Sequence, residues 1–212
     1  QADTLVAGRR AGRVSAARVL VQDSPTAVRD LIELGVEFDH DSAGELARGL
    51  EGGHSRHRVV HAGGSATGRR ITRELSAQAA EHPLITVVEQ ASAKALAIDE
   101  GRCVGVRVRI GDSEDRTLAA RSVILATGGC AALWARSTNP PAAIGSGLTM
   151  AHAAGAELAD LEFLQFHPTA LLSPSRNQGF LITEAIRGDG ATLVDDRGDR
   201  FVDELAPRDE VV

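Results

Sequence analysis

The run Val123-Ile124-Leu125-Ala126, which leads directly into Thr127-Gly128-Gly129, limits the fold of this chain more than any other feature. A short run that is apolar on both faces is typical of a central strand in a parallel sheet with helices on either side. Glycines at the carboxyl end of such a strand let a planar cofactor or a phosphate approach the backbone closely. The run therefore predicts an α/β fold with a nucleotide-type ligand at this point. A plain tight turn after a core strand explains the same residues.

Hydrophobic periodicity and turn residues predict the other elements. Helices are expected at residues 3–22, from Ser24 and Pro25 to a stop at Gly35, from Thr67 to Pro83, at residues 147–159, and from Pro207 onward. Strands are expected at residues 36–38, 59–62, 85–88, 93–98, 104–110, 117–126 and 161–166, with hairpin turns at 99–102 and 195–199. The strands between residues 85 and 126 predict a β-meander inserted in the α/β domain.

Composition excludes several classes of protein. No stretch of the 212 residues reaches the ~20 apolar residues of a membrane span, and the net charge of −6 argues against nucleic acid as a partner. Cys103 and Cys130 are too few for a disulfide framework and do not have metal-ligand spacing. We therefore expect no metal site and a reducing, cytoplasmic setting.

Two residues in polar surroundings are candidates for substrate binding. His167 lies in Gln165-Phe-His-Pro-Thr169 after an apolar segment, where its imidazole could donate to a carboxylate. A histidine satisfied at a strand end is the alternative. Glu51 begins Glu51-Gly-Gly-His-Ser55, a flexible loop that could place a carboxylate against a substrate ammonium. A solvated loop is the alternative there.

Two arginines near the ends of elements are candidates for binding anions. Arg187 and Arg208 could each hold a carboxylate through two parallel hydrogen bonds. For Arg187 the alternative is a surface ion pair with Glu184 or Asp189. For Arg208 it is an ordinary position in the first turn of a helix, where a cation opposes the helix dipole.

Blocks of residues in a consistent order run along essentially the whole chain. They are Glu51–Gly68, Ile124–Gly129, Thr138–Pro141, Met150–Leu158, Gln165–Thr169, Thr183–Ala191 and Leu205–Asp209. Together they resemble the L-aspartate oxidase family, which belongs to the succinate dehydrogenase/fumarate reductase flavoprotein superfamily. The Glu51–Ser55 block, followed by His61-Ala62, is closer to L-aspartate oxidases than to succinate dehydrogenases.

The resemblance implies a fold, a cofactor and a reaction. It implies a partial Rossmann-like domain that binds FAD non-covalently, over residues 1–160, and the start of an α+β capping domain, over residues 161–212. Members oxidise L-aspartate to iminoaspartate by hydride transfer from Cα to flavin N5, and oxygen or fumarate reoxidises the flavin. The product passes to quinolinate synthase in NAD biosynthesis.

The resemblance also implies roles for single residues. Arg208 matches the proton-shuttling arginine, although free arginine keeps its proton near pH 7 and charge stabilisation is the simpler role. His167 and Thr183 match ligands of the substrate carboxylates, and Glu51 matches the residue that recognises the substrate amine. The flavin contacts match Ala91, Ser92, Thr127, Gly128, Gly129 and Ser146.

Several positions depart from the family pattern. Ile144 and Ser146 stand in the family's Thr-Gly-Asp-Gly motif, and Ser65 stands where the family has Asp. No Gly-x-Gly-x-x-Gly phosphate loop occurs in the chain, which also begins with Gln1 rather than Met. We therefore expect an internal fragment of a longer protein that does not hold FAD tightly alone. Two alternatives stay open: a soluble fumarate reductase-like flavoprotein, and a degenerate, non-catalytic flavoprotein-like module.

Overall fold

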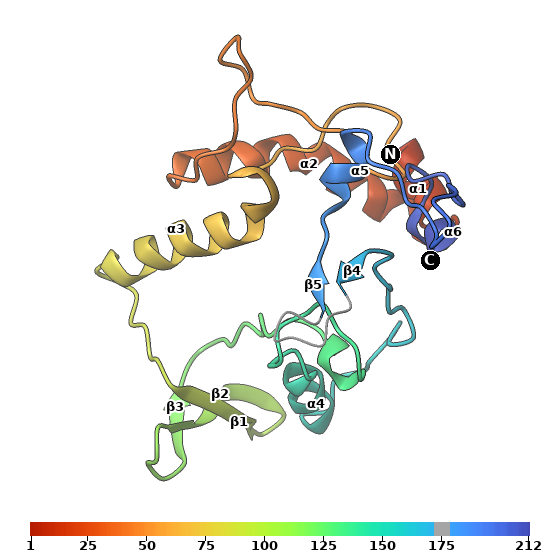
Figure 1. Ribbon diagram of the computed structural model, residues 1–212. Coiled ribbons are helices and arrows are strands. Elements are labelled where there is room, and N and C mark those ends of the chain that lie inside the picture. The colour runs from red at the N-terminus through yellow and green to blue at the C-terminus, as the bar shows by residue number, and fades with distance from the viewer. Residues whose placement is uncertain (172–178) are drawn as a thin grey trace. The chain divides into compact units, whose positions relative to one another are not determined.

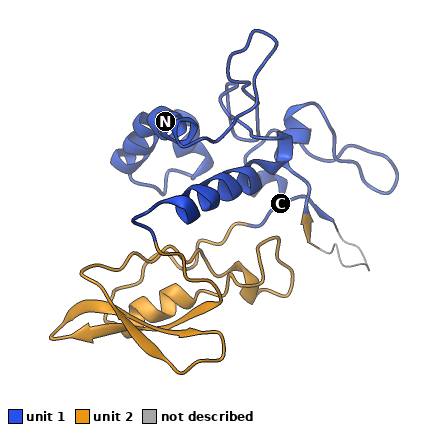
Figure 2. Ribbon diagram, turned by 90° about the vertical axis from the view of Figure 1, so that its left-hand side faces the viewer, with its two compact units in different colours: residues 1–85, 166–171, 181–212 blue, residues 86–165, 172–180 orange. Residues whose placement is uncertain are grey.

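A computed structural model describes residues 1–171 and 179–212 of the chain (Figure 1). These residues form two compact units (Figure 2). Unit 1 contains residues 1–85, 166–171 and 181–212, and unit 2 contains residues 86–165 and 179–180. Helix and sheet are mixed, as predicted. The predicted boundary near residue 160 separates a flavin domain from a cap, whereas these units are compact groups of contacting residues, so the boundary stays a prediction.

Unit 1 is built from helices and extended segments (Figure 1). Its helices are α1 (Ala2–Ala7), α2 (Val14–Glu33), the 3₁₀ turn η1 (Gly64–Ala66), α3 (Thr67–Glu81), α5 (Glu184–Gly188) and α6 (Arg208–Val211). The single helix expected over residues 3–22 is wrong, because the chain breaks between α1 and α2. Arg9 and Arg10 adopt positive φ angles of 48° and 58° there, which an α-helix does not allow.

The prediction that Ser24 caps a new helix at Pro25 is also wrong. Pro25 lies inside α2. Because proline has no N–H, it leaves the carbonyl of Val21, four residues earlier, without its helical donor. The Ser24 hydroxyl donates to that carbonyl at 3.2 Å. Ser24 therefore compensates for the proline within one continuous helix.

The core of unit 1 lies where α2 and α3 meet the extended segments near residues 36–38 and 59–62. Helix α2 ends as predicted, with Gly35 at φ 85° and Val36 N–H donating to the Leu31 carbonyl. Val36, Phe38 and Ala62 form the buried cluster, and Val28, Leu31, Leu46, Val60, Ile71 and Leu75 pack against it. The strands expected at residues 36–38 and 59–62 do not form; these segments are extended but make only isolated contacts such as the Gly49–Val59 bridge.

Unit 2 contains the predicted meander. Strands β1 (Ala91–Asp99), β2 (Arg102–Ile110) and β3 (Arg116–Ala119) form an antiparallel sheet in that order. Glu100 and Gly101 both adopt positive φ in the predicted turn between β1 and β2. Unit 2 also contains the 3₁₀ turn η2 (Ala131–Leu133) and helix α4 (Ser146–Ala153), and α4 packs against β1.

Several strand predictions in the second half of the chain are wrong. Residues 85–88, 120–126 and 161–166 are not strands, and Ile124 is 90% exposed. A strand needs a neighbouring backbone to pair with. In the described ranges the run 120–126 makes one such contact, from the Ala120 N–H to the Val104 carbonyl at 2.9 Å, and none of the three runs forms a ladder. The helix expected over residues 147–159 stops at Ala153, just before Gly155 at φ 93°. Two short strands, β4 (Ala170–Leu171) and β5 (Phe180–Leu181), pair with each other.

Candidate active site

Helix α5 brings three polar side chains of unit 1 together. Thr183 is its N-cap, and the Thr183 hydroxyl oxygen accepts the Ala185 N–H at 3.3 Å. Glu184 and Arg187, three positions apart, therefore lie on one face of the short helix. Both are buried, with 6% and 5% of their surface exposed. Arg187 thus pairs with Glu184, one of the two partners considered for it, but the ion pair is buried and not at the surface.

Glu184 lies between two arginines. Its Oε1 is 2.8 Å from Arg187 Nη2 and 2.5 Å from Arg208 Nε. Burial raises the pKa of Glu184, but the hydrogen bond and charge of Arg208, followed by the charge of Arg187, outweigh it and lower the pKa below its usual value. The carboxylate is ionised at neutral pH, so the three residues together carry one net positive charge.

Arg187 is held by backbone as well as by charge. Its Nη1 donates to the Glu204 carbonyl at 2.9 Å, which ties α5 to the segment that leads to Arg208. Among the described residues its Nε has no hydrogen-bond partner, although it is buried. A buried guanidinium with an unused donor beside a second arginine favours an anionic ligand at this point.

His167 lies close enough to this cluster for charge to affect it. Thr169 N–H is 3.2 Å from His167 Nδ1 and donates to it in the tautomer that carries its proton on Nε2. Burial lowers the pKa of His167, and the charge of Arg208 lowers it further. The lowered pKa favours the neutral imidazole at pH 7. Nδ1 also lies 3.1 Å from the Thr169 carbonyl oxygen and donates to it in the Nδ1–H tautomer, so Nε2 is a donor only in the Nε2–H tautomer.

The loop that carries Glu51 packs against the same elements. Gly53 N–H donates to the Leu205 carbonyl at 2.9 Å. At Gly188, the last residue of α5, a Cβ would lie 1.8 Å from the Leu50 carbonyl oxygen, so only glycine allows this approach. The carboxylate of Glu51 lies 3.0 Å from His61 Nε2.

The predicted substrate residues therefore all lie in unit 1, on or beside α5 and the segment that leads to α6. They are Glu51, His167, Thr183 and Arg208. Sequence reasoning did not assign a role to Glu184, to the buried position of Arg187, or to His61. The spacing of Glu184 and Arg187 directly after Thr183 was the one available signal, because a threonine N-cap predicts where the helix begins and which positions share a face.

The predicted flavin contacts lie together in unit 2. Gly145 N–H donates to the Gly129 carbonyl at 3.1 Å, which places Thr127-Gly128-Gly129 beside the start of α4 at Ser146. A Cβ on Gly147 would lie 1.9 Å from Thr127 Oγ1, so the two segments are in direct contact. Ala91 and Ser92 begin β1, which packs on α4.

The glycines of this segment have the shape that a flat cofactor needs. Gly128 has φ 71°, and a Cβ built on Gly128 or Gly129 meets no atom within 4 Å. The backbone therefore faces open space on that side, and a ring system can lie against it. Ser146, the first residue of α4, has an exposed side chain.

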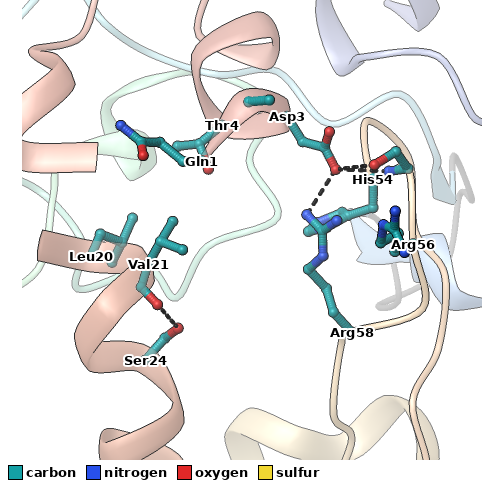
Figure 3. A pocket seen from close by; sticks show the side chains of 11 residues that line it. Gln1, Asp3, Thr4, Leu20, Val21, Ser24, His54, Arg56 and Arg58 are labelled. Carbon is teal, nitrogen blue, oxygen red and sulfur yellow. Dashed lines mark hydrogen bonds and ion pairs between the residues drawn. The ribbon is translucent and has the colours of Figure 1, made fainter. Parts of the chain in front are cut away.

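Unit 1 also contains cavities. The one in Figure 3 has a volume of about 430 Å³ and lies between α1, α2 and residues 54–58. Asp3 is among the residues that line it; its carboxylate accepts from Ser55 N–H at 2.8 Å and pairs with Arg58 at 2.7 Å. Another cavity, of about 480 Å³, is lined by residues that include His61, Ser65 and Thr183.

No group of His, Cys, Asp or Glu side chains within residues 1–171 and 179–212 could hold a metal ion. No helix there is long and apolar enough to cross a membrane.

Comparison with known families gives a match over the full sequence. The FAD-binding domain family matches residues 1–212. The chain belongs to this FAD-binding family. The segment Thr127-Gly128-Gly129, from which the sequence predicted a nucleotide-type ligand, lies within the matched residues.

Curated relatives of this FAD-binding chain are L-aspartate oxidases. The chain is 46% identical to the one from Mesorhizobium japonicum over 99% of its own length and 42% of the relative. It is 44% identical to the one from Streptomyces coelicolor, over 99% of its own length and 38% of the relative. The chain thus spans about two fifths of the length of these curated relatives.

Solved structures with the same fold come from related flavoproteins. The chain superposes on the FrdA chain of E. coli quinol fumarate reductase with a TM-score of 0.88 at 25% identity, covering 99% of the chain and 38% of FrdA. The Sdh1 complex of Mycobacterium smegmatis gives a TM-score of 0.79 at 31% identity, covering 99% and 38%. The fold is therefore that of the succinate dehydrogenase/fumarate reductase flavoproteins.

Proposed function

We propose that the protein carrying this chain is an FAD-dependent L-aspartate oxidase, which converts L-aspartate to iminoaspartate. The observation that carries the proposal is the Arg187–Glu184–Arg208 cluster, in which Glu184 and Arg187 are buried, with His167 and Thr183 beside it. The cluster has one net positive charge and suits a dicarboxylate. The curated relatives named L-aspartate oxidase support the choice of substrate.

The side chains of unit 1 bind and orient the substrate. Arg208 and Arg187 attract its carboxylates, and Glu184 holds Arg208 in place through the contact with Arg208 Nε. His167 donates through Nε2, and the Thr183 hydroxyl is available to a carboxylate oxygen. The Glu51 carboxylate accepts a hydrogen bond from the substrate ammonium group, which fumarate and succinate lack. Bound FAD would supply the acceptor for the hydride that leaves Cα.

The residues that would hold FAD are those of unit 2: Ala91, Ser92, Thr127, Gly128, Gly129 and Ser146. Residues 1–160 would belong to a Rossmann-like flavin domain, and residues 161–212 would begin a cap. The proposal has three further parts: oxygen or fumarate reoxidises the flavin, iminoaspartate passes to quinolinate synthase, and the protein is cytoplasmic. The two cysteines, Cys103 and Cys130, are free of disulfides, which supports a reducing compartment.

A soluble fumarate reductase-like enzyme is the second candidate, favoured by the superposition on FrdA. The amine separates the two substrates. In the FAD-loaded enzyme we expect Glu51→Gln to raise the KM for L-aspartate about tenfold or more, because it removes the charge that pairs with the ammonium. Fumarate reduction should change far less.

Steady-state rates with each substrate test this directly. Equal losses in the two reactions would contradict the assignment of Glu51 to the amine. A wild-type enzyme that reduces fumarate but does not oxidise aspartate would favour the second candidate. An FAD-loaded enzyme with neither activity would favour a non-catalytic module. The departures from the family pattern at Ser65, Ile144 and Ser146 are the reason to consider it.

A further inference from the structure

Glu51 is paired with a histidine that sequence reasoning did not single out. His61 Nε2 lies 3.0 Å from Glu51 Oε1, and the two side chains are only 20% and 21% exposed. We propose that His61 is a positioning residue, which turns the Glu51 carboxylate so that its second oxygen receives the ammonium group of an amino-acid substrate. The inference rests on the proposed function and names the residue that would determine its amine specificity.

The backbone holds His61 in place independently of Glu51. Gly49 packs on the imidazole so closely that a Cβ there would be 2.9 Å from His61 Cε1. Gly49 N–H donates to the Val59 carbonyl at 2.7 Å, and Asp39 N–H donates to the His61 carbonyl at 2.8 Å. The position of the ring is therefore set by two neighbouring segments, and the Glu51 carboxylate is hydrogen-bonded to a ring that these segments hold.

Histidine differs from arginine and lysine at this position because its imidazole can donate a hydrogen bond through Nε2 without a fixed positive charge, which leaves the negative charge of the carboxylate for the substrate. Arginine or lysine at residue 61 would pair with the same carboxylate and cancel that charge. A carboxylate has two oxygens, so one can be held by His61 while the other faces the ammonium.

Three variants of the FAD-loaded enzyme test the proposal. His61→Phe keeps an aromatic ring against Gly49 and removes the donor, whereas His61→Gln keeps a donor. We expect His61→Phe to raise the KM for L-aspartate about tenfold, the effect of one hydrogen bond to a charged group, with a much smaller change in kcat. His61→Gln should restore most of the affinity. The control is His57→Phe, at an exposed position of the same loop.

Calorimetry provides a readout besides turnover. His61→Phe should weaken the binding of L-aspartate about tenfold and that of succinate, which has no amine, much less. In a Glu51→Gln background, His61→Phe should add almost nothing, because a residue that acts through Glu51 loses its effect with it. Additive losses, or equal losses for both ligands, would overturn the inference.

The outcomes separate this inference from the proposed function. If the wild-type enzyme oxidises aspartate and His61→Phe behaves like His57→Phe, the inference alone is wrong. If the wild-type enzyme neither binds nor oxidises aspartate, the proposed function is wrong and the inference is refuted with it.

Discussion

Glu184 shows, at the scale of single residues, how one carboxylate holds two arginines in place. Its contacts to Arg187 and Arg208 leave little of its surface in water. Charges this deeply buried are tolerated only in pairs, since an unpaired buried ion has a high cost of desolvation. The position of Arg208 therefore depends on a residue that sequence reasoning treated as a surface partner.

We expect Glu184→Gln to lower the free energy of unfolding by about 3 kcal/mol, because Arg187 then stays buried without a counter-charge. Urea unfolding followed by circular dichroism measures it. Glu74→Gln removes the exposed ion pair with Arg73 and should change stability by less than about 0.5 kcal/mol. Equal effects of the two substitutions would contradict the burial argument.

Asp3 provides a pH-dependent prediction at the same scale. The N–H and hydroxyl of Ser55, then Arg58, hold the pKa of Asp3 at about 2, below its ordinary 3.8. A carboxyl whose folded-state pKa is lowered stabilises the fold above its unfolded pKa and loses that contribution as the pH falls through the folded value.

The difference in urea midpoint between wild type and Asp3→Asn should therefore be constant from pH 7 to about pH 5. It should shrink between about pH 4 and pH 2, because the carboxyl is protonated first in the unfolded state and only near pH 2 in the folded state. Asp112→Asn, on a turn of unit 2, is the control. A difference that does not vary with pH down to 2 would mean that Asp3 makes no such contacts in solution.

Between elements, the closest contact in the candidate site is that of α5 with the Glu51 loop. The carbonyl of Leu50 occupies the place where a side chain at Gly188 would begin. We expect Gly188→Ala to force the two segments apart, to destabilise the protein by about 1–3 kcal/mol and to raise the KM for aspartate, because Glu51 moves relative to Thr183.

Gly68→Ala is the matched control for this prediction. Gly68 lies in α3, and a Cβ there meets no atom within 4 Å. It should leave the KM unchanged and stability equal or slightly higher, because alanine has the better helix propensity. Thermal unfolding and steady-state kinetics of the two variants decide the matter. If Gly188→Ala matched Gly68→Ala, α5 and the loop would not be in contact.

Across the whole molecule, the surface holds far more apolar side chain than the core. The buried apolar residues of the described ranges are Ala17, Val36, Phe38, Ala62, Val108 and Met150. By contrast Leu84 is 88% exposed and Ile124 is 90% exposed. Where exposed apolar side chains of this kind lie together, they favour association with other surfaces.

We expect the purified 212-residue chain to bind a hydrophobic dye such as ANS and to bind FAD weakly. The 212 residues contain no Gly-x-Gly-x-x-Gly to cradle the pyrophosphate, whereas Gly128 and Gly129, which we propose lie against the flavin ring, are present. Titration of FAD followed by flavin fluorescence measures the affinity, with riboflavin as the control ligand. A stoichiometric flavin spectrum in the purified chain would contradict the prediction.

Local patterns in the sequence were sufficient for much of the fold. Alternation of Val104, Val106 and Val108 predicted β2, and Gly35 and Pro83 predicted the ends of α2 and α3. These features depend on neighbouring residues only, through side-chain periodicity and backbone propensity. The run Val123–Ala126 has the composition of a strand, but a strand also needs a partner backbone, which composition cannot supply.

The ordered blocks of the sequence by themselves determined the family and the residues to examine, among them Glu51, His167, Thr183 and Arg208. The tertiary structure alone decided what those residues touch. Glu184 contacts Arg208 across 24 positions, and Glu51 contacts His61 across 10. Such pairings depend on the path of the chain between the partners, and their charges acquire strength from burial that no local pattern encodes.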